Sequence, residues 1–145
     1  MIRSILTVCV GNICRSPMAE GLLRERLPGA TVSSAGIGAL SGRPAASHAV
    51  ALMSDKGIDI SSHRAQQISA QACRHADLIL VMEEGHKRAI ARSFSGSVGK
   101  VFALGHHNKF EVFDPYRQSR ERFEDCFDLI QKGVDDWVAR IKAIV

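Results

Sequence analysis

A cysteine and an arginine lie close together near the start of the chain, with five residues between them. Cys9 and Arg15 bracket residues 10–14, whose sequence is Val-Gly-Asn-Ile-Cys, and a Ser-Pro pair follows the arginine. The apolar residues 5–8 before the cysteine are typical of a buried strand, and Ser-Pro is typical of the beginning of a helix. A strand, a short loop and a helix N-terminus together form a site for an anion such as phosphate. A cysteine at its base would touch that anion, which indicates covalent phosphoryl transfer rather than phosphate binding alone.

Each residue type in this loop suits the binding of an anion. Gly11 lets the backbone come close, and Asn12 is the non-glycine residue that best tolerates a left-handed conformation. The planar guanidinium of Arg15 can hold two phosphate oxygens at once, a geometry that lysine does not offer. Ser16 could cap the helix or donate a hydrogen bond to the sulfur of Cys9. The same donors stabilise a thiolate, so we expect Cys9 to be ionised near neutral pH and nucleophilic.

A second segment could supply the proton that a departing phenolate needs. Asp114 is followed by Pro115, which stiffens the chain, and by Tyr116, whose ring could form one wall of a substrate site. Alone, such a tripeptide is typical of a turn. Together with the cysteine loop it indicates a general acid. The loop has no Gly-Lys-Ser/Thr of the kind that binds phosphate with magnesium, so we expect chemistry without a metal or other cofactor.

Strands and helices alternate in the pattern of apolar residues. Strands are expected at residues 2–8, 31–34, 76–82 and 100–104, and helices at 17–27, 45–56, 83–94 and 122–143, with a loop and a short helix within 61–72. This alternation predicts a single three-layer α/β domain over residues 1–145, with a flavodoxin-like, doubly wound, four-stranded parallel sheet of order 2-1-3-4 and helices on both faces. The first strand should be central, because it is the most apolar and leads into the cysteine loop. That loop would then lie at the switch point of the sheet, where such folds bind ligands.

Composition narrows the classes of function. The chain has 145 residues, 46% hydrophobic and 23% charged, and no apolar run long enough to span a membrane, so we expect a cytoplasmic protein without membrane insertion. The net charge of +4 comes without a block of basic residues, which argues against a nucleic-acid partner. The four cysteines, Cys9, Cys14, Cys73 and Cys126, lack the spacing of a zinc site. They are expected to be reactive or buried thiols.

With both segments present in this order, the chain resembles the low-molecular-weight protein tyrosine phosphatases over essentially its whole length. Residues 9–17 resemble the phosphate loop of that family, and residues 114–116 resemble its acid loop. The resemblance implies that Cys9 is the nucleophile, that Arg15 binds the phosphate, and that Asp114 is first the acid and then the base for water.

The resemblance also implies roles for the surrounding residues. The phosphate-binding loop would comprise Val10, Gly11, Asn12, Ile13, Cys14, Arg15 and Ser16. Support for this loop would come from Asn12, Ser16, Ser34 and His63, although His63 could equally be a surface histidine. The substrate wall would comprise Ile13, Leu40 and Tyr116. Cys14 could form a disulfide with Cys9 that protects it from deeper oxidation, or could simply be a small buried residue.

Two departures from the animal members of the family carry information. The segment 36–40 has no tryptophan, and Arg117 follows Tyr116 where animal members have a second tyrosine. Both features are similar to the bacterial branch that works with tyrosine autokinases of capsule and exopolysaccharide export. The partner implied is a phosphotyrosine protein, the cytoplasmic tail of such an autokinase, with the phosphatase itself a monomer or a weak dimer.

Three other functions compete with that of a tyrosine phosphatase. A thioredoxin-coupled arsenate reductase would need two further cysteines close together, and Cys73 and Cys126 are far apart in the sequence. A protein arginine phosphatase resembles this chain but has threonine in place of Ile13, and a bulky apolar residue there favours an aromatic ester. A non-catalytic phosphate-binding module would need neither the thiol nor the acid.

Overall fold

Four short segments form one parallel sheet. They are β1 (Ser4–Cys9), β2 (Thr31–Gly36), β3 (Leu78–Val81) and β4 (Val101–Ala103), in a computed structural model that describes residues 1–143. The strand order is β2-β1-β3-β4, and all three pairings are parallel. The predicted order, with the first strand inside the sheet, is confirmed.

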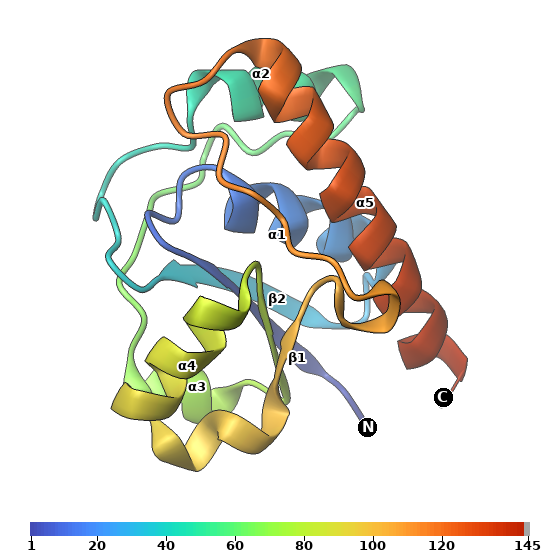
Figure 1. Cartoon of the computed structure of the whole chain (residues 1–145). Coiled ribbons are helices and arrows are strands. Elements are labelled where there is room, and N and C mark those ends of the chain that lie inside the picture. Colours follow the sequence, from blue (N-terminus) through green and yellow to red (C-terminus); the bar gives the residue numbers. More distant parts are fainter. Residues whose placement is uncertain (144–145) are drawn as a thin grey trace.

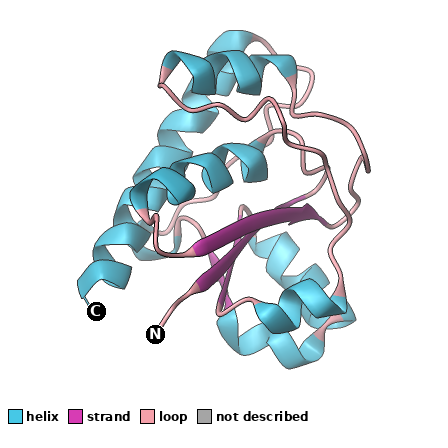
Figure 2. Cartoon of the chain, turned by 180° about the vertical axis from the view of Figure 1, so that it is seen from behind, coloured by secondary structure: helices cyan, strands magenta, loops and turns pink. Residues whose placement is uncertain are grey.

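Helices cover both faces of the sheet, as Figures 1 and 2 show. One face carries α1 (Arg15–Arg26), α2 (Ser47–Asp55) and the long α5 (Arg120–Ala143). The other face carries α3 (Ala70–His75) and α4 (Glu84–Ser93). The predicted three-layer α/β class is therefore confirmed.

Successive side chains of the central strands point alternately into two separate hydrophobic cores. Ile5 packs into the core beneath α1 and α5, whereas Leu6 packs into the core on the opposite face. Leu80 and Val81 divide between the two cores in the same way, because successive side chains of a strand point to opposite faces. The apolar side chains of the last helix form one buried stripe that includes Phe123, Phe127, Ile130, Val134, Trp137, Val138 and Ile141.

Several element ends differ from the prediction for local reasons. The last helix begins at Arg120, two residues earlier, because the Ser119 hydroxyl accepts a hydrogen bond from the amide of Arg122 (3.3 Å). The short helix expected within 61–72 lies later, at α3, where Ser69 caps the amide of Ala72. A 3₁₀ helix at Ser95–Lys100 was not predicted, since its Gly-Ser-rich sequence has no helical pattern of apolar residues.

The carboxyl edge of β1 is joined to the segment that follows β2. The amide groups of Ile37, Gly38 and Leu40 donate to the carbonyl groups of Cys9, Val10 and Gly11 respectively, each at 3.0 Å. These three bonds hold residues 37–40 against the cysteine loop. Gly36 stands at the start of this contact and is paired with Cys9 in the sheet.

This close approach predicts the effect of one substitution. A Cβ atom at Gly36 would lie 2.4 Å from the carbonyl oxygen of Val10, which is backbone and has little room to move. We expect Gly36→Ala to lower the free energy of unfolding by about 1–3 kcal/mol, as overpacking does. Gly29→Ala is the matched control, because a Cβ there meets nothing within 4 Å. Urea denaturation of both variants checks the prediction, and equal stabilities would contradict it.

Candidate active site

Residues 9–16, from the end of β1 to the first residues of α1, form a tight loop at the carboxyl edge of the sheet. We call this segment the cysteine loop. Cys9 ends β1 and is buried, and Arg15 begins α1. Asn12 has a φ of 60°, the left-handed conformation expected from its residue type. The N-terminus of α1 follows directly, so its first amide groups and its dipole favour an anion beside the cysteine.

The hydroxyl of Ser16 contacts the sulfur of Cys9. Ser16 Oγ lies 2.9 Å from Cys9 Sγ and also accepts a hydrogen bond from Asn12 Nδ2 (2.8 Å). Because the oxygen accepts from Asn12, its own hydrogen can be donated to the sulfur. Of the two roles that the sequence left open for Ser16, the geometry favours the contact with Cys9.

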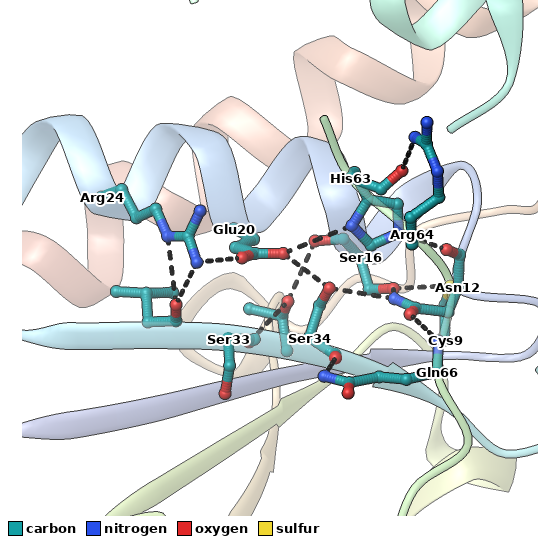
Figure 3. Close-up of polar contacts among 12 residues, drawn as sticks. Cys9, Asn12, Ser16, Glu20, Arg24, Ser33, Ser34, His63, Arg64 and Gln66 are labelled. Atoms are coloured by element: carbon teal, nitrogen blue, oxygen red, sulfur yellow. Dashed lines mark hydrogen bonds and ion pairs between the residues drawn. The ribbon is translucent and has the colours of Figure 1, made fainter. Parts of the chain in front are cut away.

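Asn12 fixes the loop from behind through four hydrogen bonds, which Figure 3 shows. Its amide nitrogen donates to Ser16 Oγ and to Ser34 Oγ (2.9 Å), and its Oδ1 accepts from the amide of Gln66 (2.9 Å). Its carbonyl oxygen lies 2.7 Å from His63 Nε2. Ser34 and His63, both expected to support the loop, thus contact the same residue.

The network continues away from the loop to a buried carboxylate. Ser34 Oγ donates to Glu20 Oε1 (2.6 Å), and Glu20 is paired with Arg24 one turn further along α1 (2.6 Å) (Figure 3). A chain of polar contacts therefore runs from the sulfur of Cys9 to an ion pair on α1. Such a network holds the loop in one conformation before any ligand binds.

Arg15 is almost completely buried, with 2% of its side chain exposed. Its Nη1 donates to the carboxylate of Glu83, at the start of α4, and to the carbonyl oxygen of Val112 (2.9 Å). Its Nη2 lies 3.7 Å from Asp114 Oδ2. One nitrogen of the guanidinium is thus held by the protein, and Arg15 also lines the cavity described below.

Asp114 and Tyr116 lie on the segment that leads from β4 to α5. The side chain of Asp114 is 46% exposed, and its Oδ1 accepts a hydrogen bond from the amide of Tyr116 (3.1 Å). Arg117 has a φ of 61° and places its guanidinium 5.2 Å from the centre of the Tyr116 ring. The short turn therefore holds the carboxylate and the aromatic ring at the mouth of the site.

A cavity of about 170 Å³ opens between these groups. Its lining includes the catalytic candidates Cys9, Arg15 and Asp114 and the three predicted wall residues, Ile13, Leu40 and Tyr116. An apolar cavity of about 150 Å³ accepts benzene, so this one has room for a single aromatic ring. The three catalytic candidates and the three wall residues are thus brought to one place, whereas Asn12 and Ser16 of the predicted phosphate-binding loop do not line the cavity.

Burial raises the pKa of the other cysteines. Burial, reinforced by the nearby Cys9 and Asp114, raises the pKa of Cys14 to about 12, so Cys14 remains a thiol at neutral pH. Burial likewise raises the pKa of Cys126 to about 12. Cys73 belongs to the core on the other face of the sheet from Cys126, so the two do not form a pair.

Sequence reasoning missed three contributors to the site. Glu83 was assigned only to a helix, although an acidic residue directly after a buried strand at the carboxyl edge was a usable signal. Glu20 and Gln66 gave no signal, because only the tertiary fold brings them to Asn12 and Ser34.

Within residues 1–143, no helix combines the length and the apolar character that crossing a membrane requires.

The family model for low molecular weight phosphotyrosine protein phosphatases matches residues 4–145. The chain is 55% identical over 144 residues to "Probable low molecular weight protein-tyrosine-phosphatase EpsP" of Ralstonia solanacearum, which covers 99% of each chain.

Two solved structures are similar throughout. Wzb of Vibrio vulnificus in complex with benzylphosphonate has a TM-score of 0.94 at 39% identity and covers 97% of this chain and 99% of its own. The YwlE arginine phosphatase of Geobacillus stearothermophilus has a TM-score of 0.91 at 33% identity. The match covers 97% of this chain and 94% of the YwlE chain. The chain belongs to the family of low molecular weight phosphotyrosine protein phosphatases, and it is a protein tyrosine phosphatase.

Proposed function

We propose that the protein hydrolyses phosphotyrosine through a phosphocysteine intermediate on Cys9, without a metal ion. The observation that carries this proposal is the lining of one ring-sized cavity by Cys9, Arg15 and Asp114. The thiolate of Cys9 would attack phosphorus and form the S–P bond. The bond from phosphorus to the phenolic oxygen would break, and Asp114 would give its proton to that oxygen.

The second half of the reaction uses the same groups. Asp114, now a carboxylate, would take a proton from water, and the resulting hydroxide oxygen would attack phosphorus. The S–P bond would break, which releases inorganic phosphate and returns Cys9 as a thiolate. Arg15 and the amide groups of the cysteine loop would stabilise the charge on the phosphoryl oxygens in both steps.

The physiological substrate that we propose is the tyrosine-phosphorylated cytoplasmic tail of a bacterial autokinase in capsule or exopolysaccharide production. The support is the similarity to EpsP and Wzb, together with an apolar wall of Ile13 and Leu40 suited to an aromatic ring. Benzylphosphonate, the compound bound to Wzb of Vibrio vulnificus, has the aromatic ring and the phosphorus group of such a substrate. This role places the protein in the cytoplasm.

Substitution of the nucleophile and of the acid tests the mechanism. We expect Cys9→Ser to abolish hydrolysis of p-nitrophenyl phosphate, because a hydroxyl is a far poorer nucleophile than a thiolate near neutral pH. Asp114→Ala should lower kcat by roughly 10²–10⁴ on phosphotyrosine, whose phenolate needs a proton to leave. All assays are run with a chelator present. Full activity of Cys9→Ser, or a wild-type enzyme that stops in chelator, would contradict the mechanism.

Ile13 is expected to select tyrosine over arginine. The similarity to YwlE makes phosphoarginine the competing substrate, and a bulky apolar side chain in the wall favours a flat aromatic ring over a polar guanidinium. We expect wild type to prefer phosphotyrosine peptides and Ile13→Thr to shift the ratio of kcat/KM toward phosphoarginine by roughly tenfold or more. Equal wild-type rates on both peptides would overturn this assignment.

A further inference from the structure

The carboxylate that holds Arg15 has a second, buried neighbour. Glu83 lies immediately before α4, and His86 lies one turn along that helix, with only 9% of its side chain exposed. His86 Nε2 is 3.5 Å from Glu83 Oε2, the same oxygen that accepts the hydrogen bond from Arg15. The three side chains therefore form a row from Arg15, through the partly exposed Glu83, to His86.

The other nitrogen of this imidazole is buried and unused. Among residues 1–143, His86 Nδ1 has no hydrogen-bond partner. A buried polar atom without a partner is unfavourable, so an apolar side chain of similar size would fill this space at lower cost. The contact of Nε2 with Glu83 is the one feature of His86 that an apolar side chain could not supply.

Glu83 needs such a contact. Its side chain is 38% exposed, so water can compete with Arg15 for the carboxylate. The long side chain of a glutamate before a helix has several rotamers, and only some of them place Oε2 against Arg15. An N–H group of the largely buried His86 ring beside Oε2 favours the rotamer that holds Arg15 in place.

We propose that His86 is a positioning residue for Arg15, acting through Glu83 as a neutral imidazole with its proton on Nε2. The inference rests on the proposed function in that Arg15 is taken as the phosphate-binding group. It adds a residue that touches neither substrate nor the reacting atoms.

The electrostatic surroundings agree with a neutral imidazole. Burial lowers the pKa of His86, and the charge of Arg15 lowers it further. Glu83, Glu111 and Asp114, which face it from the start of α4 and from the segment after β4, oppose that shift without cancelling it. At neutral pH the ring therefore has one proton, and placing that proton on Nε2 puts an N–H group beside the carboxylate, with Nε2 3.5 Å from Oε2.

The first test reads the tautomer directly in the wild-type protein. Long-range ¹H–¹⁵N NMR spectra of the imidazole near neutral pH should show Nε2 protonated and Nδ1 unprotonated. A ring protonated on Nδ1 would overturn the proposal, whatever the activity of the enzyme.

The second test is a double-mutant cycle read by the dissociation constant of inorganic phosphate, measured by calorimetry, which does not depend on turnover. We expect His86→Ala to weaken phosphate binding by roughly fivefold to thirtyfold in the wild-type background and to change it little in a Glu83→Gln background. Equal effects of His86→Ala in both backgrounds would overturn the proposal. If phosphate binds as expected but no aryl phosphate is hydrolysed, the proposed function fails while this inference stands.

Conservative variants separate positioning from packing. Glutamine places its amide nitrogen as many bonds from Cα as Nε2 of histidine, whereas asparagine matches Nδ1. His86→Gln should therefore restore phosphate binding to within about threefold of wild type, and His86→Asn should not. Ile90→Ala is the control for lost stability alone. Ile90 is a buried residue of the same helix that packs with Leu6 in the core on this face of the sheet, and its truncation should leave phosphate binding unchanged. Rescue by asparagine as complete as by glutamine would also contradict the assignment.

Discussion

The site depends on burying one positive charge. Transferring a guanidinium out of water costs several kcal/mol even after relaxation, and Arg15 is withdrawn almost completely. Its Nη1 is compensated by the carboxylate of Glu83 and by the carbonyl of Val112. These partners come from the turn after β3 and from the segment after β4, so one ion pair and one hydrogen bond of the same guanidinium join three parts of the chain. The arginine is therefore oriented before any phosphate arrives, and binding need not order it.

The backbone of the cysteine loop is fixed by a second constraint, the left-handed conformation of Asn12. Such a conformation is unfavourable for most residues, and here it is stabilised because every polar group of the side chain has a partner. The loop is thus held from its rear by side chains, while its front remains available to an anion. The backbone bonds from residues 37–40 complete the arrangement and bring Leu40 to the wall of the cavity.

The parts of the site that lie within one short segment could be predicted from the sequence. The strand, the loop and the helix start lie within residues 4–17, and the spacing of Cys9 and Arg15 determines which chemistry they can do. The order of the sheet followed from the alternation of strands and helices and from the apolar character of β1. Asp114 was found because its Pro-Tyr context is informative once the cysteine loop is known.

The remaining contacts are tertiary, and among their residues only Glu83, directly after a buried strand, left a local signal. Glu20, Glu83 and Gln66 lie on three different segments, and their roles arise only when the sheet brings those segments together. The end of β1 was placed one residue short, because Cys9 joins the sheet through its pairing with Gly36 rather than through its own propensity. His86 was assigned to a helix with nothing to distinguish it from a surface histidine.

Trapping the intermediate shows whether a buried and preorganised arginine presents phosphate to a cysteine nucleophile. Asp114→Ala enzyme is mixed with an aryl phosphate whose phenolate leaves readily, quenched within the first turnover, and its peptides are examined by mass spectrometry. We expect one phosphoryl group, located on Cys9. Turnover with a phosphoryl group on any other residue, or with Cys9 unmodified throughout the burst, would contradict it.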